Sequence, residues 1–227
     1  MSFAEKTASV AWTNDGKFGN FVPAGYWIDT EIKGDLNNDG LEDYVLQIIG
    51  PKKVTIHNEC WDGPKCSRGG IIIVFNKGDS FELAMENRDC FTTTDKNDDD
   101  CSWECGYGIT VCEVSINKGN LYLGYANGNN GYWYYTFRYQ NSDFELIGYD
   151  HTAKVGPCEI NTIESINFLT KKRLTKKNIK DVCDECNACD VDDVFEEKWE
   201  SFTIEKPIKL REIENVDFFY PNIKIKE

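Results

Sequence analysis

Residues 26–49 read YWIDTEIKGDLNNDGLEDYVLQII, which is two strand-like segments on either side of a polar loop. Residues 26–33 alternate between apolar and polar side chains, and residues 43–49 form a nearly continuous apolar run. The loop between them is too short for a crossover connection, so the two strands pair side by side in opposite directions. This stretch therefore predicts the strand–loop–strand unit from which an antiparallel sheet is built.

The same signals recur along the rest of the chain. Strands are predicted at residues 70–76, 80–86, 109–116, 121–126, 132–140, 144–150, 162–169 and 172–178, and a short helix near 191–198. Turn residues of the hairpin type separate these segments. We predict a mainly β fold, an antiparallel sandwich-like meander with long disulfide-stapled loops and little helix. Residues 1–227 form one domain, with a core at about 20–180 and a Cys- and acid-rich loop and tail at 181–227.

The polar loop has the oxygen spacing of a cation site. The predicted ligands are the side chains of Asp35, Asn37, Asp39 and Asp43 and the carbonyl of Leu41. Gly40 allows the left-handed backbone that folds such a loop around an ion. Calcium prefers about six to eight oxygen ligands, so the spacing predicts a structural calcium site. An acidic hairpin turn without metal is the alternative.

The loop does not match an EF-hand. An EF-hand has a bidentate Glu at loop position 12, where this chain has Leu46, and its loop joins two helices rather than two strands. The pattern resembles instead the cation loop of FG-GAP and VCBS-type proteins. The wider chain resembles small bacterial periplasmic or lipoprotein-type β proteins that carry one such loop, through residues 21–27, 70–75, 135–140 and 144–150. This resemblance implies a β fold and an exported location, and it implies no activity.

The chain is acidic, with 25 Lys and Arg against 39 Asp and Glu and a net charge of −14. Such a surface repels nucleic acid and favours cations or a protein partner with a basic surface. No apolar run is long enough for a transmembrane segment. We expect a periplasmic or extracellular protein. Residues 1–6 are no signal peptide, so this expectation requires that the signal, with any lipid anchor, precedes Met1 in the exported precursor.

Ten cysteines lie mostly in loop-like segments, which favours disulfides formed in an oxidising compartment. Cys90 and Cys101 are expected to pin the acidic run 95–100. Cys183, Cys186 and Cys189 have C-x2-C-x2-C spacing, for which zinc binding is the alternative. The run 95–100 is also a candidate second cation site, although it has no glycine to close the turn.

The strand at 132–140 has two chemically different faces. Trp133, Tyr135, Phe137 and Tyr139 share the face that we expect in the core. The opposite face carries the candidate ligand-binding residues, which with one loop residue are Tyr132, Tyr134, Arg138 and Trp103. A partly covered outer face without a ligand is the alternative, because exposed aromatic side chains are common.

No catalytic constellation stands out. The two histidines, His57 and His151, are far apart in sequence, and His151 is expected to be structural. No nucleophile elbow or phosphate-binding glycine loop is found. We predict a non-catalytic exported calcium-binding protein that acts through protein–protein interaction, such as an immunity-type inhibitor of a toxin. A glycan-binding module of the cell envelope and a hydrolase with an acid-only active site are the alternatives.

Overall fold

The computed structural model describes residues 16–57, 62–92, 110–126, 131–155, 159–179, 194–217 and 219–226. For residues 53–57, 62–66, 110–112, 155 and 159 it describes the backbone alone. These ranges contain twelve strands and one 3-10 turn, and no α-helix. The prediction of a mainly β, antiparallel fold is confirmed.

Four strands form a small sheet in the order β1-β2-β3-β4. They are β1 (Trp27–Gly34), β2 (Asp43–His57), β3 (Asp62–Asn76) and β4 (Phe81–Thr92). The apolar run in β3 is buried on both faces, as a continuous apolar strand requires, and Ile71 to Val74 are fully buried. Residues 16–26 cover the outer face of this sheet, where Phe18 packs against Tyr44 and Phe81.

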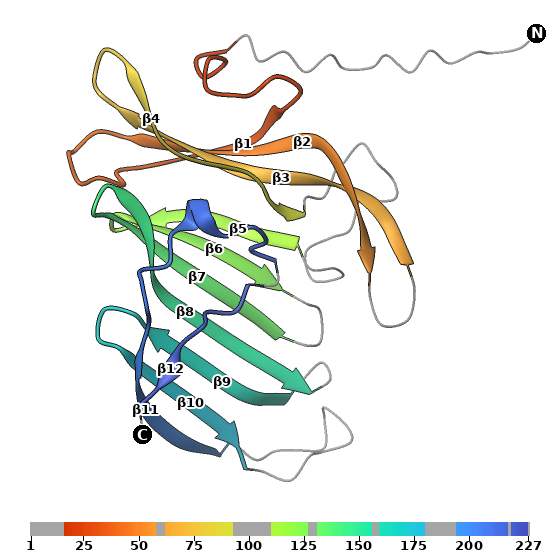
Figure 1. Cartoon of the computed structure of the whole chain (residues 1–227), viewed down its shortest axis with the longest axis vertical. Coiled ribbons are helices and arrows are strands. Elements are labelled where there is room, and N and C mark those ends of the chain that lie inside the picture. Colours follow the sequence, from red (N-terminus) through yellow and green to blue (C-terminus); the bar gives the residue numbers. More distant parts are fainter. Residues whose placement is uncertain are drawn as a thin grey trace, which may run out of the picture.

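Eight strands form a large sheet in which neighbours along the chain are mostly neighbours in space (Figure 1). They are β5 (Thr110–Asn117), β6 (Asn120–Ala126), β7 (Gly131–Gln140), β8 (Asp143–Val155), β9 (Glu159–Asn167), β10 (Lys172–Asn178), β11 (Phe195–Thr203) and β12 (Lys224–Ile225). The predicted core face of β7 is confirmed at Tyr135 and Phe137, which are fully buried.

The small sheet packs on one end of the large sheet and leaves the β9–β11 end uncovered by it (Figure 1). The shared core joins Val45, Ile71 and Ile73 of the small sheet to Leu123, Phe137 and other inner-face residues of the large one. We call the face of the large sheet that carries these residues its inner face. The result is an asymmetric sandwich, which agrees with the sandwich-like prediction.

Residues 205–217 and 219–223, near the C-terminus, run across the inner face of the large sheet (Figure 1), and we call them the strap. It includes the 3-10 turn η2 (Leu210–Glu212). Leu210, Ile213 and Val216 are buried in the shared core, between β4 and β8. The strap therefore supplies part of the core that the small sheet does not reach.

Two sequence predictions need correction. The helix near 191–198 is wrong from residue 195 onward, because β11 begins there and pairs with β10 along its whole length. Strand pairing outweighed local helical preference. The stapled loops are not supported in the described part of the chain, where Cys90 is a free, buried thiol whose Sγ lies 3.7 Å from the carbonyl oxygen of Asn87. Cys90 therefore does not pin the acidic run through Cys101.

Candidate calcium loop and ligand-binding faces

The loop between β1 and β2 is tightly turned. Asn38 and Gly40 have φ angles of 61° and 87°, in the left-handed region that glycine and asparagine tolerate best. The Asp35 carboxylate accepts hydrogen bonds from the backbone N–H groups of Asp39, at 3.2 Å, and Gly40, at 3.0 Å. Asn37 Oδ1 accepts one from Asp39 N–H at 2.9 Å. Three side-chain oxygens therefore accept hydrogen bonds from backbone N–H groups of the loop itself.

Asp43 has a different part in the loop. Its side chain is fully buried, and its two oxygens accept hydrogen bonds from Leu36 N–H at 2.9 Å and Asn76 N–H at 3.0 Å. Burial raises the pKa of this carboxyl, while hydrogen bonds from the backbone of Asn76, Leu36 and Asn37 act in the opposite direction. Asp43 thus ties the loop to the end of β3.

The loop lies where the two sheets meet. A Cβ on Gly119, in the turn between β5 and β6, would come within 2.8 Å of the Asn38 side chain. A Cβ on Gly34 would come within 2.6 Å of the Ile116 side chain in β5. An ion held in the loop would therefore stiffen the contact between the small and the large sheet.

The loop residues do not form a ready-made acidic cage. Within the described ranges, no three His, Cys, Asp or Glu side chains come together in a group suited to a metal ion. Asp35 and Asp39 use their oxygens on backbone donors, and Leu41 is partly exposed. Carboxylate, amide and carbonyl oxygens are nevertheless the donors that calcium takes, so the residue types present fit this ion.

The outer face of the large sheet carries the predicted tyrosine platform. Tyr134 lies directly over Gly124, where a Cβ would come within 2.6 Å of its ring, so only glycine lets the ring rest on the sheet. Tyr132 is 39% exposed and lies edge-on to Tyr134, with ring centroids 6.2 Å apart. Arg138 donates to Asn120 Oδ1 at 2.9 Å. The three predicted residues in β7 thus share one face.

The strand register adds a residue that the sequence prediction missed. Tyr134, Asp150, Ser165, Leu174 and Trp199 lie in one row across the outer face. Trp199 is 63% exposed. The sequence places Trp199 on no face, because it predicts a helix over part of the segment that forms β11. Period-two alternation from the buried Phe202 would have found it.

Several predicted site residues lie outside the described residues. They are Trp103, the acidic run 95–100, and Cys183, Cys186 and Cys189. A second cation site at 95–100 and zinc binding at the three cysteines stay predictions.

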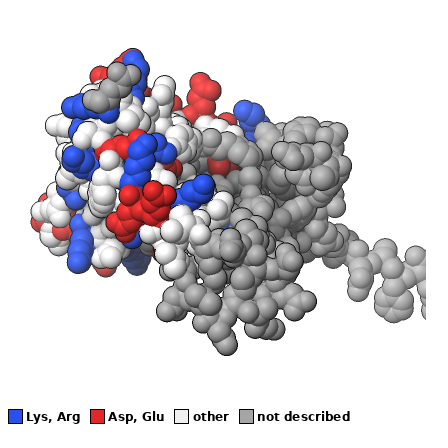
Figure 2. Space-filling model, turned by 90° about the horizontal axis from the view of Figure 1, so that it is seen from below, with Lys and Arg blue, Asp and Glu red and all other residues white. Residues whose placement is uncertain are grey.

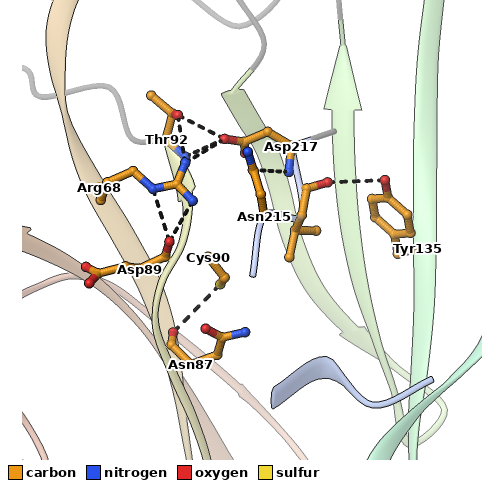
Figure 3. Close-up of polar contacts among 9 residues, drawn as sticks. Arg68, Asn87, Asp89, Cys90, Thr92, Tyr135, Asn215 and Asp217 are labelled. Atoms are coloured by element: carbon orange, nitrogen blue, oxygen red, sulfur yellow. Dashed lines mark hydrogen bonds and ion pairs between the residues drawn. The ribbon is translucent and has the colours of Figure 1, made fainter. Parts of the chain in front are cut away.

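A buried ion pair fixes the strap to the small sheet (Figure 3). Arg68 of β3 lies 3.1 Å from Asp217 Oδ2, and both side chains are less than a tenth exposed. Thr92 donates to the same oxygen from its backbone N–H, at 2.8 Å, and from its hydroxyl, at 2.9 Å. Arg68 also donates to the carbonyl of Asp89. Because every partner is a strap or strand residue of the core, this network is structural.

The described surface is close to electroneutral. The described ranges hold 22 Lys and Arg against 24 Asp and Glu, which accounts for only −2 of the net charge of −14. In the view from below, side chains of the two signs are interleaved (Figure 2). Eleven of the 39 acids fall in residues 93–109 and 180–193. The acidity of the chain is therefore concentrated in sequence and not spread over the sandwich.

Comparison of the chain with protein-family models, with curated proteins and with solved structures gave no match in any of the three. The resemblance to FG-GAP and VCBS-type cation-loop proteins therefore stays a prediction from the loop residues. The described residues include no helix that is long and apolar enough to cross a membrane.

Proposed function

We propose that this protein is a non-catalytic binding protein of the periplasm or extracellular space whose fold is stabilised by one calcium ion. The observation that carries the proposal is the convergence of Asp35, Asn37 and Asp39 oxygens in the loop between β1 and β2, which contacts the large sheet. The ion would be held by these side chains with the Leu41 carbonyl and Asp43. It would stabilise the folded state by mass action rather than act as a signal.

The test is thermal unfolding of the whole chain with calcium and with chelator. Asp39→Asn keeps an acceptor for the backbone N–H of Leu41 but removes one charge. We expect it to lower the melting temperature in calcium and to have little effect in chelator. Asn167→Ala, which removes a turn-capping side chain elsewhere, serves as the control and should have equal effects in both conditions. Equal loss for Asp39→Asn in both conditions would remove the calcium proposal.

The proposed partner is a protein with a basic surface, and an immunity-type inhibitor of a toxin is the sharpest form of this role. The net charge of −14 supports it, and the two Asp-rich segments concentrate that charge. Association of this kind weakens steeply as salt rises. A pull-down at low and high salt tests it, with the Asp-to-Asn variant of residues 98–100 as the probe. Equal capture at low and high salt, and by the wild type and this variant, would contradict an electrostatic partner.

A glycan-binding module of the cell envelope is the second candidate. The observation that favours it is the Tyr134 ring resting over Gly124 beside the exposed Tyr132. Flat, accessible rings stack against the apolar faces of sugars, and their area contributes to binding at little entropic cost. Tyr134→Ala should abolish binding to cell-envelope polysaccharide while Leu83→Ala, another exposed residue on the small sheet, leaves it unchanged. Equal binding by both variants would exclude this face.

A further inference from the structure

The inner face of the large sheet changes character along its length. Near the small sheet it is apolar, with Leu123, Tyr135 and Phe137 buried. Farther along, one row of directly paired residues becomes polar. We call this row the inner polar row, and it consists of Trp133, His151, Glu164, Thr175 and Lys198. The small sheet lies toward the β5 end of the large sheet and not over β9–β11 (Figure 1), and Lys198 of β11 is exposed. A sandwich does not need polar groups on this face to fold.

Glu164 is the centre of a hydrogen-bonded cluster at this row. Its side chain is 8% exposed, and its Oε1 accepts from Arg173 Nε at 2.6 Å and from the Tyr220 hydroxyl at 2.9 Å. Burial, with the hydrogen bond to Glu164, raises the pKa of Tyr220 to about 12, so the hydroxyl stays protonated and donates. A buried ion pair of this kind contributes little net stability compared with apolar residues. A contribution to the stability of the fold therefore does not by itself account for the cluster.

His151 faces Glu164 across β8 and β9, between two aromatic rings. Its ring centroid lies 6.2 Å from that of Trp133 and 6.3 Å from that of Tyr149. Burial lowers the pKa of the imidazole, and the Glu164 carboxylate opposes this effect. A neutral imidazole carries one donor and one acceptor nitrogen. Among the described residues, neither nitrogen has a hydrogen-bond partner, and the side chain is partly exposed.

The charges of the cluster cancel within it. Arg173 pairs with Glu164 at 2.6 Å and with Glu200 at 3.5 Å, and Lys198 pairs with Glu200 at 2.7 Å. An anionic ligand would have to break the Arg173 pairs, and a cationic ligand would compete with them for Glu164. A neutral ligand rich in hydroxyl groups leaves these ion pairs intact. It can bind the uncharged donors and acceptors of the row, because each hydroxyl both donates and accepts. The Trp133 ring stacks in parallel on Tyr125, with centroids 5.3 Å apart, and the part of it that stays exposed offers such a ligand an apolar wall.

We propose that the inner polar row is a binding site for a neutral oligosaccharide, with His151, Glu164 and Thr175 as its hydrogen-bonding groups and Trp133 as its wall. The proposal names a ligand class for the non-catalytic binding role proposed above and rests on that role. It depends neither on calcium nor on the outer-face tyrosines. It also assigns a purpose to a buried charge cluster that neither the shared core nor the calcium loop requires.

The experiment is NMR of the whole protein during titration with cellohexaose, maltohexaose, mannohexaose and chitohexaose. The chain has only two histidines, so His57→Gln assigns the imidazole signals directly. We expect one hexaose to shift the His151 signal and to leave the His57 signal in place. Thr175→Val removes one hydroxyl without changing the size of the side chain, and we expect it to weaken binding about tenfold. The matched control is Thr136→Val, the same change on the outer face, which should leave the affinity unchanged.

The outcomes separate the two faces and the two proposals. A His151 shift that Thr175→Val weakens and Tyr134→Ala leaves intact supports the inner site. No His151 shift with any of the four hexaoses overturns it, as does binding that only Tyr134→Ala abolishes. Both results are read with and without calcium. If the calcium proposal fails, binding at the inner polar row is still measured independently.

Discussion

At the scale of single residues, we expect the buried Arg68–Asp217 pair to be the contact whose loss lowers the free energy of unfolding most. Removing one member of a buried pair leaves an uncompensated charge, which costs about 3–5 kcal/mol. We therefore expect Asp217→Ala to lower the free energy of unfolding in urea by about that amount. Arg88→Ala breaks an exposed pair with Glu86 and should cost less than about 1 kcal/mol. Similar losses for the two variants would show that the buried network does not hold the strap.

The same carboxyl makes stability depend on pH. Burial raises the pKa of Asp217 to about 6 from an ordinary value of 3.8. The folded state then binds this proton more tightly than the unfolded chain. The stabilisation that this proton gives the folded state is complete below about pH 4 and is lost as the pH rises through about 6. The shift corresponds to on the order of 3 kcal/mol.

This pH dependence is measured as a difference between two proteins. Urea unfolding gives the free energy of unfolding of the wild type and of Asp217→Asn. We expect the difference in favour of the wild type to shrink by on the order of 3 kcal/mol between pH 4 and pH 7. Other carboxyls titrate in both proteins and cancel in the difference. An advantage that grows with pH would mean that the ion pair with Arg68 outweighs burial.

At the scale of elements, the strap is held by side chains rather than by a strand ladder. Asn87 Nδ2 donates to the carbonyls of Leu210 and Ile213, each at 2.8 Å. The Tyr135 hydroxyl, which has one proton to donate, lies within hydrogen-bond distance of the carbonyl oxygens of Val216 and Phe219. Asn87→Ala would leave two strap carbonyls without this donor, at about 1–3 kcal/mol for each group left buried and unpaired. We expect faster hydrogen exchange at residues 208–216.

The control for the strap is a matched change elsewhere. Asn167→Ala removes the acceptor for the backbone N–H groups of Leu169 and Thr170, in the turn between β9 and β10. It should leave exchange in the strap unchanged. If Asn87→Ala also leaves it unchanged, the apolar contacts of Leu210 and Ile213 are enough to hold the strap.

At the scale of the whole molecule, the cysteine count limits the disulfides. Cys90 is free, and the other nine of the ten cysteines cannot all pair with one another. The disulfide prediction therefore becomes at most four bridges with two free thiols. We expect two reactive thiols in denaturant with a thiol-specific reagent, and one in Cys90→Ala. A value near ten would contradict disulfides and favour a reduced compartment.

The sequence by itself determined most of the strands, though not β11, because alternation and buried apolar runs follow from the two-residue period of a strand. It predicted the core face of β7 through Tyr135 and Phe137, and it predicted the loop in which Gly40 takes a left-handed φ. The side-chain oxygens of that loop were found because their spacing is local. These features depend on neighbours within one turn or one strand.

Only the tertiary structure decided what lies far apart in sequence. Pairing with β10 made residues 195–203 a strand, and the strap carried Asp217 to Arg68, 149 positions away in the chain. The inner polar row needed the register of five strands to bring His151 beside Glu164 and Thr175. Local preference does not specify such contacts, because their energy depends on partners that only the folded chain brings together.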